Sequence, residues 1–270
     1  MTVDGFFPAL SAVINAFFLV AGVYIYVSLM RQIAARRSFP EDTSVRTFGL
    51  PEAILAALLA SFFLLTLLGG APQEVPRMRS HDLIYSAALT IGLLLALAGF
   101  LRLRRFDLNS LGGFSRIGFF RTAITGAVLL LAAYPLIFLA DVITQRLLRS
   151  APQKQAIVEM FSRSSTLEER ILIIVLAVSL APLAEEFIFR FFFYGVMKRY
   201  LGRTAAVVAS ALLFAAVHAH LPSFAPLFVL GACFAIAYEW SGSILVPMMM
   251  HTLFNAITLT ALAFPELFPQ

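Results

Sequence analysis

The sequence predicts an all-α, polytopic membrane protein with about eight transmembrane helices. Of its 270 residues, 60% are hydrophobic and only 13% are charged, whereas soluble proteins carry roughly 25% charged residues. The hydrophobic residues gather in runs of about 20 residues, the length that an α-helix needs to cross the hydrocarbon core of a bilayer. The lipid bilayer is therefore the solvent in which this chain is expected to fold.

The predicted spans fall into two groups of four, separated by the longest polar interruption of the chain. The first group comprises residues 6–29, 51–68, 83–101 and 119–142, and the second comprises residues 171–197, 204–220, 224–240 and 244–264. The interruption, residues 145–170, mixes both charge signs with apolar side chains, a pattern typical of a helix at the membrane interface. We therefore predict accessory helices over residues 1–150 and a four-helix core over residues 151–270.

The charged residues lie mainly between the spans. The formal charge is +5, but the basic residues are divided among several loops, which indicates membrane topology and no binding of nucleic acid. With eight spans both termini lie on one side, and lysines and arginines are more frequent in the loops of the other side. The positive-inside rule therefore predicts that the termini are on the non-cytoplasmic side.

Three ionisable side chains interrupt the fifth span. Glu185, Glu186 and Arg190 belong to the segment Glu-Glu-Phe-Ile-Phe-Arg, and a charged group at the bilayer centre costs roughly 3 kcal/mol even on insertion scales. On a helix Glu186 and Arg190 share a face, whereas Glu185 is rotated by about 100°. We therefore predict that Arg190 holds Glu186 and that Glu185 is left to react.

Polar side chains also interrupt two later spans. His218 follows Phe214 by four residues and Asn255 follows His251 by four, so each pair lies on one helix face. With a rise of about 1.5 Å per residue, Glu185, His218, His251 and Asn255 can all fall in one layer near the middle of the membrane. This arrangement indicates a single buried polar cavity.

Other residues near these motifs have simpler interpretations. Pro182 precedes the glutamates and removes a backbone N–H from the span, so that it either only kinks the helix or opens it beside Glu185. His220 lies at a span end and is expected to be a packing residue. Four of the five phenylalanines that follow the glutamates are expected to face lipid or to pack: Phe189, Phe191, Phe192 and Phe193.

The residue types of this cavity suit amide hydrolysis. A glutamate beside an imidazole can accept a proton from water, and a second imidazole together with an amide can donate hydrogen bonds to an oxyanion. Glu185, His218 and His251 also match the imidazole and carboxylate ligands of catalytic zinc. A proton-coupled transporter is the alternative from another class, although we find no internal repeat of the kind common in transporters.

The three motifs, taken together, resemble those of the CPBP family, the CAAX proteases and bacteriocin-processing enzymes, which are related to type II CAAX prenyl endopeptidases. The motifs occur in the order Glu185-Glu186-x-x-x-Arg190, Phe214-x-x-x-His218 and His251-x-x-x-Asn255. The resemblance covers roughly residues 167–265 and does not extend to the first four spans. It implies an intramembrane endopeptidase that hydrolyses a peptide bond of a membrane-associated or lipidated protein or peptide.

The resemblance also implies roles for six residues. Glu185 would activate water with the help of His218. Glu186 and Arg190 would support the activating carboxylate. His251 and Asn255 would stabilise the oxyanion. A metalloprotease version would hold zinc with Glu185, His218 and His251. We favour the version without a cofactor, because the amide of Asn255 is a poor zinc ligand. A non-catalytic immunity or scaffold protein on the same fold is a further alternative.

Overall fold

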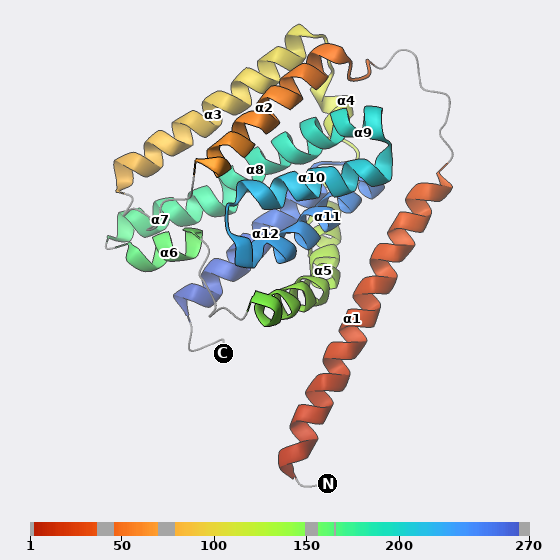
Figure 1. Ribbon diagram of the computed structural model, residues 1–270, viewed down its shortest axis with the longest axis vertical. Coiled ribbons are helices and arrows are strands. Elements are labelled where there is room, and N and C mark those ends of the chain that lie inside the picture. Colours follow the sequence, from red (N-terminus) through yellow and green to blue (C-terminus); the bar gives the residue numbers. More distant parts are fainter. Residues whose placement is uncertain (1–2, 37–45, 70–78, 149–155, 165, 265–270) are drawn as a thin grey trace.

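The computed structural model describes residues 3–36, 46–69, 79–148, 156–164 and 166–264, and most of these residues are helical (Figure 1). No strand occurs within these ranges. The first part of the chain forms α1 (Val3–Ala35), α2 (Leu50–Leu68), α3 (Ser80–Leu103), the short α4 (Leu108–Gly112), α5 (Phe119–Leu148) and α6 (Ala156–Arg163). The predicted all-α, polytopic architecture is confirmed.

The second part of the chain begins with a composite helix from Leu167 to Leu201. It consists of α7 (Leu167–Val175), the π-helical turn η1 (Leu176–Leu180), α8 (Ala181–Glu186), the π-helical η2 (Phe187–Tyr194) and α9 (Gly195–Leu201). Then follow α10 (Arg203–Val217), the 3₁₀ turn η3 (Leu221–Ser223), α11 (Phe224–Ser241) and α12 (Leu245–Ala263). In this part of the chain α10 packs against α9 and α11, and α11 packs against α12.

Seven helical segments of the described ranges have the length and apolar composition of a membrane span. The sixth predicted span, residues 204–220, is shorter than expected, because α10 has 15 residues and a length of about 22 Å. The chain leaves the helix at His218 and turns at Ala219, whose φ is +50°. Within the described ranges, the predicted number of about eight spans corresponds to seven long spans and one short apolar helix.

The segment between the transmembrane helices is shorter than the predicted interfacial segment, residues 145–170. Helix α5 continues to Leu148, and α7 begins after Thr166. The Thr166 hydroxyl accepts a hydrogen bond from the Glu169 amide (3.1 Å) and the Glu169 carboxylate accepts one from the Thr166 amide (3.3 Å), a reciprocal cap that fixes the start of a helix. Helix α6 lies between α5 and α7 in the sequence, and its Phe161 packs in a cluster with Ile173 of α7.

A single hydrophobic cluster joins the two groups of helices. Its buried members include Tyr26 of α1, Leu101 of α3, Leu130 of α5, Phe192 of η2 and Met250 of α12. The N-terminal part of α1 extends beyond the rest of the molecule (Figure 1), and its C-terminal part packs on α5 and α11. The accessory helices are thus continuous with the core, and the predicted boundary at residue 150 stays a prediction.

The phenylalanine run lies inside the bundle and does not face lipid. Four side chains of η2 are at most 3% exposed: Phe189, Phe191, Phe192 and Phe193. Phe63 of α2 stacks on Phe189, and Phe214 of α10 meets the edge of the same ring. Of the two interpretations of this run, packing is therefore correct and lipid exposure is wrong.

Candidate active site

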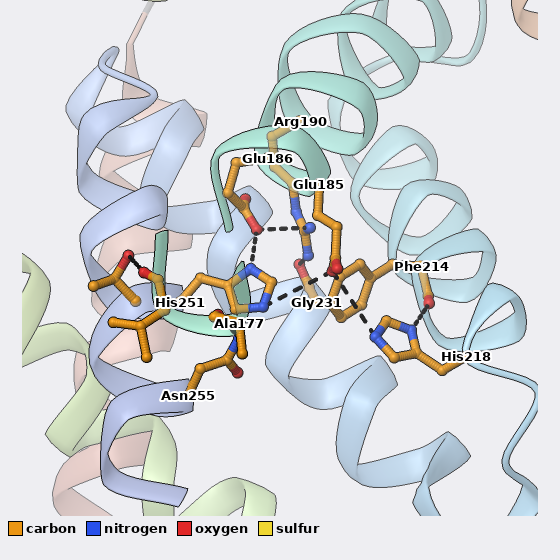
Figure 2. Close-up of polar contacts among 11 residues, drawn as sticks. Ala177, Glu185, Glu186, Arg190, Phe214, His218, Gly231, His251 and Asn255 are labelled. Atoms are coloured by element: carbon orange, nitrogen blue, oxygen red, sulfur yellow. Dashed lines mark hydrogen bonds and ion pairs between the residues drawn. The ribbon is translucent and has the colours of Figure 1, made fainter. Parts of the chain in front are cut away.

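Five of the six predicted site residues come together between three helical segments (Figure 2). The composite helix contributes Glu185 and Glu186 from α8 and Arg190 from η2. His218 follows the last residue of α10, and His251 lies in α12. Residues as far as 65 positions apart in the sequence are in direct contact here, as the His251–Glu186 hydrogen bond illustrates.

Arg190 and Glu186 form a fully buried ion pair. The Arg190 Nη1 donates to Glu186 Oε1 at 3.0 Å, and both side chains are 0% exposed. The guanidinium also donates from Nη2 to the carbonyl of Gly231 at 3.3 Å. Its carbon lies 4.2 Å from the ring centroid of Phe214 and 5.1 Å from that of Phe234. The predicted pairing is therefore present, and cation–π contacts add to it.

His251 lies between the two glutamates. Its Nδ1 is 2.9 Å from Glu186 Oε1, and its Nε2 is 3.8 Å from Glu185 Oε2. Adjacent glutamates on a helix point about 100° apart, and this ring meets one of them with each of its nitrogens. The two carboxylates thus belong to one site even though they leave the helix in different directions.

His218 approaches Glu185 from the opposite side (Figure 2). Its Nδ1 lies 2.7 Å from the carbonyl oxygen of Phe214, and its Nε2 lies 3.9 Å from Glu185 Oε2. A carbonyl oxygen can only accept, so Nδ1 carries the proton and Nε2 of the neutral ring has a lone pair. Phe214 therefore has two functions: its carbonyl orients His218 and its ring covers Arg190.

The carboxylate of Glu185 faces both imidazoles without a direct hydrogen bond to either. The distances of 3.8 and 3.9 Å exceed those of N–H···O hydrogen bonds, about 2.7–3.2 Å. Glu185 Oε2 is buried and has no hydrogen-bond partner among the described protein atoms. This oxygen can therefore bind a water molecule next to two imidazole nitrogens.

Asn255 is the sixth predicted residue, and its side chain forms a hydrogen bond to backbone. Its Nδ2 donates to the carbonyl oxygen of Ala177 in η1 at 2.8 Å. The amide has a second N–H, on which the predicted role as an oxyanion donor depends. No observation tests that role.

Sequence reasoning missed three residues that hold the site together. These are Gly231 and Phe234 of α11, which contact Arg190, and Thr252 of α12, whose hydroxyl donates to the Val178 carbonyl at 2.9 Å. Only Thr252 had a signal in the sequence, because it lies within the motif His-Thr-Leu-Phe-Asn. The other two are an ordinary glycine and an ordinary phenylalanine in an apolar span.

The types of residue in the site suit zinc, but their spacing is wide. Nε2 of His218, Nε2 of His251 and Oε2 of Glu185 are possible ligand atoms, and hydrogen bonds from Nδ1 orient both rings as is usual for zinc histidines. Tetrahedral bonds of 2.0–2.1 Å place ligand atoms about 3.3 Å apart, so the present separations would have to contract by about 0.5 Å. Within the described ranges, no group of three potential ligands has the geometry to hold a metal ion.

A cavity of about 420 Å³ adjoins Glu185 and His218. Helices α2 and α3 form the wall opposite these two residues, and most of the lining is apolar. The lining of this wall consists of Phe63, Ser86, Ala87, Thr90 and Leu93. The accessory helices thus contribute to the surroundings of the carboxylate.

Comparison with protein families finds a similarity for the C-terminal part of the chain. Residues 167–257 match the family described as type II CAAX prenyl endopeptidase Rce1-like. This region is similar to the Rce1-like family. The Rce1-like region includes all six predicted site residues and begins with α7, so the predicted resemblance to the CPBP family is confirmed there. Comparison with curated proteins and with solved structures gives no match.

Replacement of Gly231 by alanine is predicted to disturb the buried ion pair. An added Cβ would lie 3.1 Å from Phe214 Cδ1 and 3.3 Å from Arg190 Nη2, and such overpacking typically costs about 1–3 kcal/mol. Gly99→Ala in α3 is the control, because nothing lies within 4 Å of its added Cβ. Thermal unfolding in detergent should show a lower midpoint for Gly231→Ala only. Equal midpoints for the two variants would contradict the prediction.

Proposed function

We propose that this protein is an intramembrane endopeptidase in which Glu185 activates water for peptide hydrolysis. The match to the Rce1-like family supports a CAAX-type membrane protease. The observation that carries the finer proposal is the convergence on Glu185 Oε2 of two imidazole Nε2 atoms, at 3.8 and 3.9 Å. Both rings are held by hydrogen bonds from their other nitrogen, which keeps these Nε2 atoms directed at the carboxylate.

In the proposed reaction Glu185 acts as the general base. Its carboxylate takes a proton from a water molecule while the water oxygen forms a bond to the carbonyl carbon of the substrate. The resulting tetrahedral intermediate collapses when the C–N bond breaks and the leaving amine receives a proton from protonated Glu185. His218 assists by accepting a hydrogen bond from the water through Nε2, which orients its oxygen toward the substrate.

His251 and Asn255 are proposed to stabilise the oxyanion. A ring protonated on both nitrogens would donate from Nδ1 to Glu186 and from Nε2 to the substrate oxygen. Asn255 would donate through its second N–H, the one that is not bonded to the Ala177 carbonyl. Glu186 and Arg190 support this arrangement, since they fix His251 and compensate each other's charge inside the bundle.

The proposed substrate is a membrane-associated or lipidated protein or peptide. Support comes from the cavity beside Glu185, which has an apolar lining and a few polar groups such as Ser86 and Thr90. An apolar residue or lipid chain of the substrate would fill it while the scissile bond lies at Glu185. The shape of α3 would then influence which substrates are cleaved.

Glu185→Gln is predicted to abolish cleavage, because the amide cannot accept the proton of water. A positioned general base contributes about 10²–10⁴-fold, so activity should fall by a factor in this range. Protein fragments in membranes from cells that express each form are compared by mass spectrometry, and the purified protein in liposomes is assayed with a farnesylated CAAX peptide. Glu168→Gln, an exposed carboxylate in the first turn of α7, is the control. Cleavage by Glu185→Gln at the wild-type rate would exclude the proposed mechanism.

Ala87→Phe is predicted to raise KM for the farnesylated peptide. Ala87 lines the cavity beside Glu185, and a phenylalanine ring there would occupy space that the substrate needs. Ala88→Phe adds the same ring at an exposed neighbouring position outside the cavity lining and should leave KM unchanged. Kinetic assays in liposomes measure both variants. Identical KM values would argue against substrate binding in this cavity.

Chelation is predicted to leave activity intact, because we propose the version of the mechanism without a metal. In a zinc enzyme the ion would lower the pKa of bound water to about 7 and act as a Lewis acid, so chelators would abolish cleavage and added zinc would restore it. Metal content of the purified protein and cleavage are measured before and after dialysis against a chelator. If the protein contains stoichiometric zinc and loses it together with activity, the metalloprotease mechanism is correct and the proposed mechanism is wrong.

A further inference from the structure

The helix that carries the two glutamates begins with a break in its backbone hydrogen bonding. Pro182 is the second residue of α8 and has no N–H to donate. It follows the π-helical turn η1, in which the Ala181 amide donates to the carbonyl of Leu176, five residues earlier. In the same register position 182 would donate to Ala177, and in the α-helical register it would donate to Val178. Proline can donate to neither carbonyl.

Helix α12 supplies donors to the same two carbonyls. The Asn255 Nδ2 donates to the Ala177 oxygen at 2.8 Å, and the Thr252 hydroxyl donates to the Val178 oxygen at 2.9 Å. Figure 2 shows Asn255 directed at Ala177, on the helix that also carries His251. Thr252 and Asn255 are three residues apart and therefore lie on one face of α12.

The same two segments meet again at the proposed catalytic residues. His251, next to Thr252 in the sequence, contacts Glu186 at 2.9 Å and Glu185 at 3.8 Å. Helix α12 is thus attached to the composite helix on both sides of Pro182: through backbone carbonyls before it and through carboxylates after it. A shift of α12 along α8 would break both sets of contacts together.

We propose that Thr252 is a positioning residue, which fixes the register of α12 against α8 through the Val178 carbonyl and so sets the distance from His251 to Glu185. Pro182 has a part in this arrangement, because it withholds the N–H that would otherwise compete for the carbonyls. The Thr252 hydroxyl bonds to a backbone carbonyl that takes no part in the proposed reaction. The kinetic consequence rests on the proposed function, whereas the structural consequence does not.

The test compares Thr252→Val with Thr252→Ser and Thr258→Val in the full-length protein. Valine keeps the branched shape but loses the hydroxyl, and serine keeps the hydroxyl. Thr258 is the matched control, because its hydroxyl donates within its own helix to the Phe254 carbonyl at 2.9 Å. Hydrogen exchange in detergent should be about tenfold faster for the amides of residues 178–181 and 183–186 in Thr252→Val, and unchanged in Thr252→Ser and Thr258→Val.

Cleavage of the farnesylated CAAX peptide supplies the second readout. Thr252→Val should lower kcat about tenfold with KM unchanged, because the substrate is bound normally but His251 and Glu185 are displaced. Thr252→Ser keeps the hydroxyl, so its kcat should equal that of the wild type. If the wild-type protein does not cleave the peptide, the exchange data still decide the positioning role, and only the proposed function is affected.

A second variant tests the part of Pro182. In Pro182→Ala the restored N–H can donate to Val178 or Ala177, so replacement of Thr252 by valine should accelerate exchange much less in this background than in the wild type. Thr252→Ala replaces Thr252→Val if the valine variant does not fold. Equal exchange in Thr252→Val and Thr258→Val would overturn the proposal, and so would an effect of Thr252→Val that is the same in the Pro182→Ala background as in the wild type.

Discussion

The buried pair of Glu186 and Arg190 is the interaction on which the rest of the site depends. Both side chains are fully excluded from solvent, and removal of either partner would leave an uncompensated charge, which typically costs about 3–5 kcal/mol. The surrounding residues are arranged around this pair: Phe214 and Phe234 cover the guanidinium, Gly231 accepts from it, and His251 donates to the carboxylate.

The two glutamates differ in the residues that contact their carboxylates. Glu186 is bound by Arg190 and His251, so its charge is compensated inside the protein. Glu185 lies near two imidazoles at distances too long for direct hydrogen bonds, and 28% of its side chain is exposed. The difference in environment, rather than any difference in residue type, is the basis for the proposed role of Glu185 in proton transfer.

The helices outside the Rce1-like region also contribute to the site. Helix α3 forms part of the cavity wall beside Glu185 and His218, and α5 packs against α11 and α12, which hold Arg190 and carry His251. The proposed catalytic residues therefore come from the last helices of the chain, whereas the cavity proposed for the substrate is lined by both groups.

The sequence by itself determined the helical class, the position of most spans and five polar side chains that come together between the helices. These follow from local properties: hydrophobic run length predicts a span, and charges in such runs cost too much to occur without a function. Four-residue spacing predicted the Glu186–Arg190 pair. Only the tertiary structure decided that His251 contacts both glutamates and that Asn255 and Thr252 serve the carbonyls near Pro182. Those contacts join residues more than 60 positions apart, and helical periodicity specifies which face a side chain occupies but not which helix that face meets.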